Sequence, residues 1–235
     1  MDDAMSVVEE RLAWWRYPFA ATRLRVKASA SSLGRLTPLE HAVYPGRQKE
    51  SGKSRGQAYH RVIQFLDPDA DSLEKARTAA EALLKKGVLE TEDLEAVDLE
   101  LIVMFWKSEI GVRIKRQQRE YLHRELPFTA RFSNRELRDL GFQVSDDPFI
   151  EDEPILIQGI VDLAVVTPEE IWLLDFKSES FRPEELAERT ERHTPQLSLY
   201  RDALEKTYRR TVTQTWIHYL ELRRTMTIPP SKNRD

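Results

Sequence analysis

An aspartate and a lysine directly follow an apolar run in the last third of the chain. Residues 171–180 read IWLLDFKSES, so Asp175 and Lys177 come after four residues typical of a buried strand. Side chains two apart on a strand share a face, which places this carboxylate and this amine side by side. Charged groups in a core strand are unfavourable unless they are paired or bind a ligand. The segment therefore predicts either an ion pair or a functional site.

A second acid is expected opposite this pair. Residues 153–178 form two apolar, β-branched runs joined by Thr-Pro-Glu-Glu, which predicts a β-hairpin with a type I turn. A turn centred on Pro168 and Glu169 pairs Asp162 with Asp175 across the hairpin. Two carboxylates in that position repel one another unless a cation lies between them.

A divalent cation would explain this arrangement. Mg²⁺ binds one or two carboxylates together with waters and a substrate phosphate. Lys177, held by the acids, could orient or deprotonate a water for attack on phosphorus. The structural alternative is a buried ion pair between Asp175 and Lys177, with Asp162 capping the end of the strand.

A helix predicted over residues 194–210 adds an amide and a phenol. Thr194 is expected to cap this helix and Pro195 to occupy its first position. Gln196 and Tyr200 are four residues apart and share a face, and Gln196 would lie in the first turn, where free backbone N–H groups favour an anion. The alternative is an ordinary amphipathic helix with a packed apolar face.

His60 lies within a predicted helix over residues 54–67, after the basic stretch GKSRG. A lone histidine is more often a satisfied structural residue than a ligand, so by itself His60 predicts little. The remaining histidines have the structural interpretation: His41, His123, His193 and His218.

The order of elements predicts an α/β fold. Further helices are expected at 72–87, with Ser72 as cap and Gly87 as stop, and at 91–116, with Thr91 as cap and a possible break at Gly111. Strands are expected at 119–132 and 213–222, beside the hairpin. Helices followed by strands, a helix and a strand indicate a sheet with a helical half packed on it.

Composition narrows the class of protein. The chain has 235 residues, is 40% hydrophobic and 32% charged, and contains no cysteine, which excludes disulfides, thiolate zinc sites and iron–sulfur clusters. No apolar run approaches bilayer length, and the N-terminus MDDAMSVVEE lacks the features of a signal peptide. We therefore expect a cytoplasmic protein without a membrane partner.

The net charge of −4 hides basic segments near the N-terminus. Residues 11–35 contain six Lys/Arg and no acid, mixed with Trp14, Trp15, Tyr17 and Phe19. Basic residues also dominate 46–61. Such segments are either solvated helix faces or a surface for a polyanion, and the second interpretation proposes DNA contacts for Lys53, Arg55 and Arg61.

Six segments, taken together and in order, resemble the PD-(D/E)xK nuclease superfamily. The resemblance is to the RecB-type nuclease domain at the C-terminus of AddA-like helicase–nucleases, and it spans roughly residues 16 to 220. The segments are RYPFAATRLRVKASASSL, GQAYHRVIQFLD, HRELPF, QGIVDLAVV, LLDFKSES and PQLSLYRDAL.

The resemblance implies a restriction-endonuclease-like fold with a mixed central sheet of about four or five strands flanked by helices. It also implies that Mg²⁺ or Mn²⁺ is bound by His60, Asp162, Asp175 and the carbonyl of Phe176. Lys177 would be the catalytic lysine, with Gln196 and Tyr200 as an accompanying pair. Glu125 matches an acidic position of the HRELPF segment and receives no assigned role.

The implied activity is hydrolysis of DNA phosphodiesters, as an exonuclease on single-stranded ends delivered by a helicase during break repair. The chain reads DFKS where the family often has DYKT, and His193 stands where a tyrosine is frequent. The absence of cysteines favours the AddA branch over the AddB branch, and no GxxxxGK[ST] motif for an ATPase motor is present. An AddB-like partner is therefore expected, together with a helicase domain or subunit.

The expected division is a linker or extension over 1–25, a nuclease domain over 26–228 and a frayed tail over 229–235. Two alternatives stay open. One is a catalytically silent DNA-binding or partner-docking module of the same fold, and the other is a stand-alone repair endonuclease.

Overall fold

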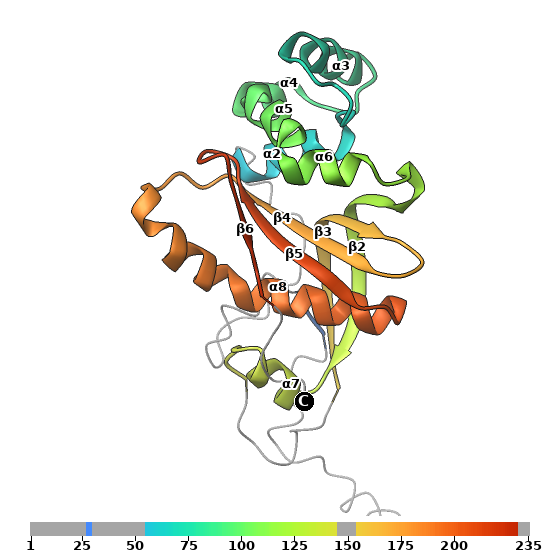
Figure 1. The fold of residues 1–235 in the computed structure, drawn as a ribbon, viewed down its shortest axis with the longest axis vertical. Coiled ribbons are helices and arrows are strands. Elements are labelled where there is room, and N and C mark those ends of the chain that lie inside the picture. The colour runs from blue at the N-terminus through green and yellow to red at the C-terminus, as the bar shows by residue number, and fades with distance from the viewer. Residues whose placement is uncertain (1–26, 30–54, 145–153, 230–235) are drawn as a thin grey trace, which may run out of the picture.

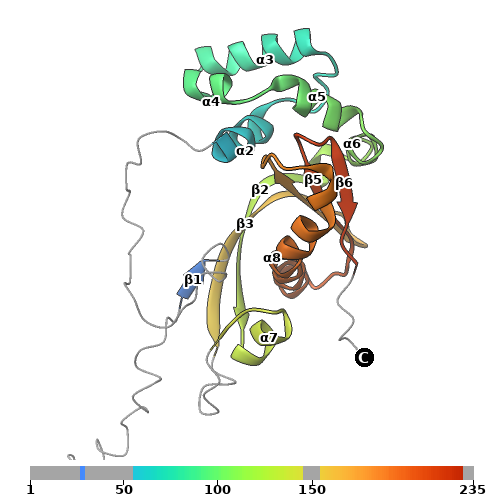
Figure 2. The same cartoon turned by 90° about the vertical axis from the view of Figure 1, so that its left-hand side faces the viewer.

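The computed structural model describes residues 27–29, 55–144 and 154–229, and the remaining residues are drawn in grey in Figure 1. The expected N-terminal extension, His41, Lys53 and the tail beyond Pro229 lie outside the described residues. Helices gather at one end of a twisted sheet, and one long helix crosses the sheet on its other face (Figures 1 and 2).

A mixed sheet of six strands forms the centre of the molecule. Its strands are β1 (Lys27–Ser29), β2 (Leu122–Phe132), β3 (Ile155–Val166), β4 (Ile171–Lys177), β5 (Val212–Tyr219) and β6 (Arg224–Thr227). β2 runs antiparallel along nearly all of β3, and because a strand has two edges, β1 and β4 share the other edge of β3. β5 is parallel to β4 and antiparallel to β6. The predicted mixed α/β architecture is confirmed, with β1 and β6 as strands that the sequence pattern did not predict.

The hairpin of β3 and β4 has the predicted register. Its ladder runs from Val166 opposite Ile171 to Leu163 opposite Leu174, so Asp162 and Asp175 occupy the next step. Thr167 closes the turn, because its hydroxyl accepts hydrogen bonds from the backbone N–H groups of Glu169 and Glu170. The hairpin therefore places both acids at the point where the two strands part.

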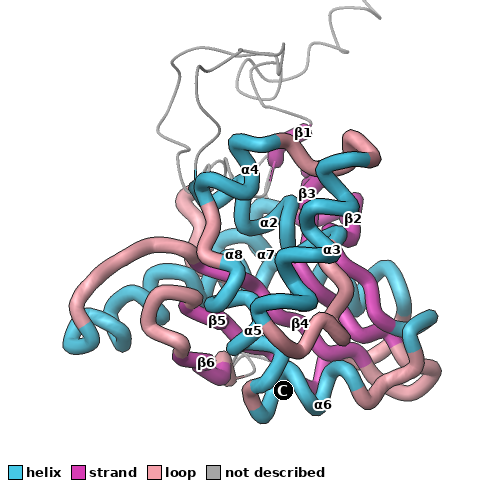
Figure 3. Tube along the Cα trace, turned by 90° about the horizontal axis from the view of Figure 1, so that it is seen from above, coloured by secondary structure: helices cyan, strands magenta, loops and turns pink. Residues whose placement is uncertain are grey.

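Five helices form a layer on one face of the sheet, over β3, β4 and β5 (Figure 3). They are α2 (Arg55–Phe65), α3 (Leu73–Lys85), α4 (Thr91–Ala96), α5 (Leu99–Lys107) and α6 (Glu109–Lys115). The predicted cap Ser72 accepts a hydrogen bond from the Lys75 backbone N–H, and Gly87 has φ = +69° just beyond the helix end. Among the described residues, no helix combines the length and apolar character that a membrane span requires.

The single helix predicted over 91–116 is wrong, because the structure divides it into α4, α5 and α6. Asp98 and Ser108 cap the two later helices, and Glu90, not Thr91, precedes the first. The break lies at Ser108 and not at Gly111. A Cβ at Gly111 would lie 2.2 Å from the carbonyl oxygen of Phe105, so glycine allows α6 to fold back closely against α5.

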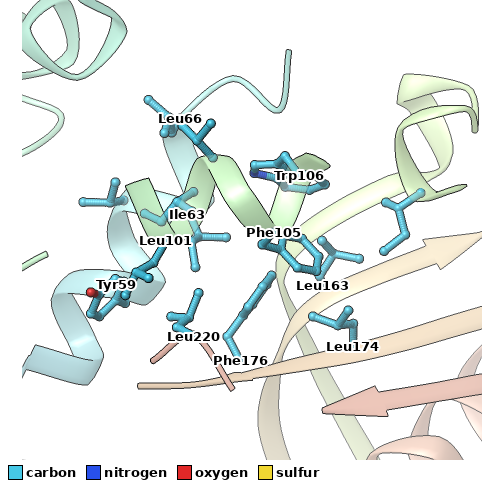
Figure 4. Packing of buried hydrophobic residues seen from close by; sticks show 14 of the residues in the cluster. Tyr59, Ile63, Leu66, Leu101, Phe105, Trp106, Leu163, Leu174, Phe176 and Leu220 are labelled. Carbon is cyan, nitrogen blue, oxygen red and sulfur yellow. The ribbon is translucent and has the colours of Figure 1, made fainter. Parts of the chain in front are cut away.

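Two hydrophobic cores lie on opposite faces of the sheet. On β4, Ile171 and Leu173 pack in the core beneath α8 (Leu186–Tyr208), whereas Leu174 and Phe176 pack against the helical layer. Figure 4 shows the second core, in which Phe176 lies beside Phe105 with ring centroids 4.7 Å apart. Burial on both faces makes β4 a rigid strand whose end carries the predicted catalytic residues.

The long helix α8 begins at Leu186, so the predicted start at Thr194 is wrong. A 3₁₀ turn, η5 (Pro183–Glu185), leads into it, and the hydroxyls of Thr190 and Thr194 donate to carbonyls one turn back. Pro195 therefore lies inside the helix, where it has no N–H to donate. Gln196 is not in a first turn, and the expected contact of a phosphate with free backbone N–H groups is lost. The other short elements are η3 (Arg119–Tyr121) and α7 (Asn134–Asp139).

Candidate active site

The long ribbon of β2 and β3 reverses its faces at one step, opposite Glu125 and Asp162. Before the reversal, Leu122 of β2 packs against the helical layer; after it, Leu126 and Phe128 pack beneath α8. The ladder joins Arg124 to Leu163 and Leu126 to Val161 but omits the step between them. Glu125 and Asp162 are the two residues at that step.

The backbone of Glu125 causes this reversal. Its φ is +53°, in the left-handed region that an L-residue enters at a cost of roughly 1–2 kcal/mol. Such strain persists only where the surrounding structure imposes it, and it often accompanies a functional role. Here it turns the Glu125 carboxylate toward His60 of α2, with Oε1 3.3 Å from Nδ1.

His60, Glu125 and Asp162 form a compact group of potential metal ligands. The Oδ1 atom of Asp162 lies 3.2 Å from His60 Nδ1, and ligand atoms of all three residues lie within 4.8 Å of one another. Their side chains are partly open, with 32%, 21% and 11% exposed in that order. Two carboxylates and an imidazole at these distances fit a divalent cation that accepts hard oxygen ligands.

The charges of this group are strongly coupled. Burial disfavours a charged His60, but hydrogen bonds and the charges of Asp162 and Glu125 outweigh it and raise the pKa of His60 to about 10. Burial and the neighbouring Asp175 raise the pKa of Asp162 to about 6. The site thus concentrates negative charge that a proton on His60 compensates, and a bound cation would compensate the same charge.

Arg124 fixes the helix that carries His60. Its Nη1 donates to the carbonyl oxygens of Ile63, at 3.0 Å, and Leu66, at 2.5 Å, at the C-terminal end of α2. These carbonyls have no partner within the helix, so the guanidinium satisfies them and complements the helix dipole. Tyr59, beside His60, is fully buried and accepts a hydrogen bond from the Asp98 backbone N–H. Neighbouring residues of β2 therefore hold α2 and contact its histidine.

A second group extends from β4 to α8. Lys177 Nζ lies 2.8 Å from Asp175 Oδ2 and donates to Gln196 Oε1 at 3.3 Å, and Gln196 Nε2 donates to the Tyr200 hydroxyl at 2.7 Å. Burial lowers the pKa of Lys177, but the charge of Asp175 outweighs it and the pKa is raised. Lys177 is therefore protonated at neutral pH. Burial and the nearby carboxylates raise the pKa of Tyr200, which keeps its phenol protonated as well.

The two groups belong to one site. Asp162 Oδ2 accepts a hydrogen bond of 2.7 Å from the backbone N–H of Phe176, which lies between Asp175 and Lys177. The carboxylate thereby bridges the fork between β3 and β4, where the ladder has ended. Asp175 and the carbonyl of Phe176 lie outside the triad of clustered ligand atoms, and their role as metal ligands stays a prediction.

The family model described as the PD-(D/E)XK nuclease superfamily matches residues 28–233. The chain belongs to this superfamily. Three curated relatives are described as the first, or "A", component of an ATP-dependent helicase/nuclease. The protein of Clostridium acetobutylicum is 34% identical over 67% of this chain, that of Bacillus velezensis 31% over 72%, and that of Anoxybacillus flavithermus 27% over 90%. The matched regions are only 12%, 15% and 17% of these relatives, so the chain corresponds to a small part of each.

The two described arginines with predicted DNA contacts make intramolecular contacts in this PD-(D/E)XK chain. Arg61 donates to the Val88 carbonyl at 3.1 Å and lies 3.3 Å from the buried Asp93. Arg55 forms an ion pair with Glu221. Arg61 thus joins α2 to the segment around α4, and a DNA contact for either arginine stays a prediction.

Sequence reasoning left Glu125 without a role, although the structure makes it a partner of His60. Regular alternation along 119–132 would place Glu125 on a face with His123 and Pro127, away from α2. The reversal depends on a single left-handed residue, and no local signal in the sequence predicts it, because glutamate rarely adopts that conformation. The structural interpretation of His218 agrees with its burial and its hydrogen bond to Thr225.

Proposed function

We propose that this chain is a metal-dependent deoxyribonuclease domain that hydrolyses DNA phosphodiesters. The observation that carries the proposal is the convergence of the His60–Glu125–Asp162 triad with the Asp175–Lys177 pair at the fork between β3 and β4. A structural ion pair would explain Lys177 beside Asp175, but it would not explain a strained acid turned toward a histidine.

The triad, together with Asp175, would hold Mg²⁺ or Mn²⁺. When bound, the cation polarises the phosphate and lowers the pKa of a coordinated water. Lys177 is protonated, so it serves as a donor that orients the water or a phosphate oxygen and offsets negative charge in the transition state. Gln196 holds the Lys177 ammonium group, and Tyr200 in turn holds the Gln196 amide.

The finer assignment rests on the names of the relatives. Because they are described as components of helicase/nucleases, we propose that this domain acts as an exonuclease on single-stranded DNA ends. A helicase domain or subunit would deliver these ends during double-strand break repair, with an AddB-like partner, in the cytoplasm. The dependence on Mg²⁺ belongs to the same proposal.

The test is cleavage of end-labelled single- and double-stranded DNA with Mg²⁺ or with chelator. We expect cleavage that requires the metal and falls at least about 100-fold in Asp175→Ala and Lys177→Ala. Lys75→Ala is the matched control, because Lys75 is an exposed lysine paired with Asp71 away from the site. DNA binding without metal-dependent cleavage would support the silent binding module instead. Cleavage that is equal in all three variants would overturn the proposal.

A further inference from the structure

We propose that Ile160 is a substrate-contact residue that packs against the base or sugar of the nucleotide beside the scissile phosphate. Among the described residues, Phe65 and Ile160 are the large hydrophobic side chains that are exposed, at 40% and 50%. Ile160 lies within β3, two residues before Asp162 of the candidate metal triad. The inference rests on the proposed nuclease function and names the part of the substrate that this surface contacts.

The side of the sheet on which Ile160 lies follows from its neighbour. Val161 is fully buried in the core beneath α8, and successive side chains on a strand point to opposite faces. Ile160 therefore points to the face on which α2 lies, which is the side from which His60 reaches the triad. Two strand residues span about 7 Å, so Ile160 and the metal ligands lie within reach of one nucleotide.

The ribbon around Ile160 forms an open patch beside the site. β1 pairs with β3 only as far as Gln158, and β4 begins to pair at Leu163, so this edge of β3 has no paired strand between those positions among the described residues. Pro127, opposite Ile160 on β2, is exposed, and the hydrogen bond between Gln158 and Thr129 is exposed as well.

The chemistry of the patch fits a single-stranded nucleic acid. A nucleotide combines an anionic phosphate, which the metal triad would bind, with a flat apolar base that loses water when it packs on an aliphatic side chain. An isoleucine offers no hydrogen bond to a base edge, so the contact would favour a nucleotide without selecting its sequence. This property suits an enzyme that degrades strands of any sequence.

The experiment compares Ile160→Ser with Phe65→Ser, a matched control that removes the other exposed large hydrophobic side chain. Binding of a fluorescein-labelled oligo(dT) is measured by anisotropy with Ca²⁺ in place of Mg²⁺. Hydrolysis of the same oligonucleotide and of bis(p-nitrophenyl) phosphate, which has no base or sugar, is measured with Mg²⁺. Thermal unfolding of each variant confirms that it is folded.

We expect Ile160→Ser to raise the Kd and KM for the oligonucleotide about tenfold, with unchanged kcat/KM for bis(p-nitrophenyl) phosphate and no effect of Phe65→Ser. Equal oligonucleotide binding by the two variants would overturn the inference, as expected if another protein segment covers Ile160. An equal loss on the small substrate would also overturn it, because Ile160 would then act on the metal site itself. If the wild-type chain binds but cleaves nothing, the proposed function fails while the Kd comparison still decides the contact. If the wild type does not bind the oligonucleotide, both fail.

Discussion

Glu125 combines a strained backbone with a carboxylate at the metal triad, and the two effects can be separated. In an ordinary strand, glycine is less stable than alanine by about 0.5–1 kcal/mol, because glycine loses more conformational freedom on folding. At φ = +53° the order reverses, since alanine keeps the strain and glycine relieves it. We expect Glu125→Gly to be about 1 kcal/mol more stable than Glu125→Ala in urea unfolding with chelator, although both lose the carboxylate.

Thr129 provides the control for this comparison. It is an exposed residue of the same strand, and it is not among the described non-glycine residues that have positive φ. Thr129→Gly should therefore be less stable than Thr129→Ala. The same order of stability at both positions would show that Glu125 is not strained.

His218 predicts a pH dependence of stability. Burial lowers its pKa to about 4, below the ordinary value of 6.5, so the folded chain keeps this imidazole neutral. Between these values the unfolded chain binds more protons, and the free energy of unfolding falls as the pH decreases from 6.5 to 4, by about 3 kcal/mol in total. His218→Gln should remove this contribution, which is measured as the difference between the urea-unfolding curves of variant and wild type at each pH. A difference that does not change with pH would contradict the prediction.

At the scale of the element, α2 is useful to the site only if it is held against β2. Arg124 supplies this link by donating to two carbonyls at the end of the helix. Arg124→Met keeps much of the apolar stem but leaves those carbonyls without the guanidinium, which costs about 1–3 kcal/mol of stability. Because His60 is then less well positioned, we expect Mn²⁺ affinity, measured by calorimetry, to fall about tenfold or more.

Arg119→Met is the matched control for α2. Arg119 binds the exposed side chains of Asp67 and Asp69 just after the helix, whereas Arg124 binds the last carbonyls of the helix itself. Arg119→Met should lose little stability and no metal affinity. Equal losses in the two variants would assign the effect to general destabilisation and not to the position of His60.

The elements that local sequence could predict are those with local causes. The β3–β4 hairpin and its register follow from alternation and from a turn built around Pro168, and Ser72 caps its helix through an adjacent backbone N–H. The start of α8 could not be predicted in this way. Pro195 imitates a helix start, whereas the actual entry is the 3₁₀ turn at Pro183.

At the scale of the whole molecule, the sequence and the resemblance together named His60, Asp162, Asp175 and Lys177 as site residues, and the structure gathers these at the fork. What could not be predicted is how they divide. Asp162 turns toward α2 with Glu125, while Lys177 turns toward Gln196 on α8. This division depends on the reversal of faces in β2 and β3, which arises from packing between segments far apart in the chain.

The triad draws its side chains from α2, β2 and β3, so a bound cation would join the helical layer to the sheet. A ligand that binds only the folded chain stabilises it by about 2.7 kcal/mol at 100 times its Kd, which is about 5–10 °C in Tm for a chain of this size. We expect Mn²⁺ to produce this rise in the wild type, measured by calorimetric unfolding against a chelator-treated sample. Asp162→Asn and His60→Gln should abolish the rise, and Asp71→Asn, which removes an exposed acid elsewhere, should retain it. The same rise in Asp162→Asn would mean that the cation binds outside the triad, and the layers would then be joined by packing alone.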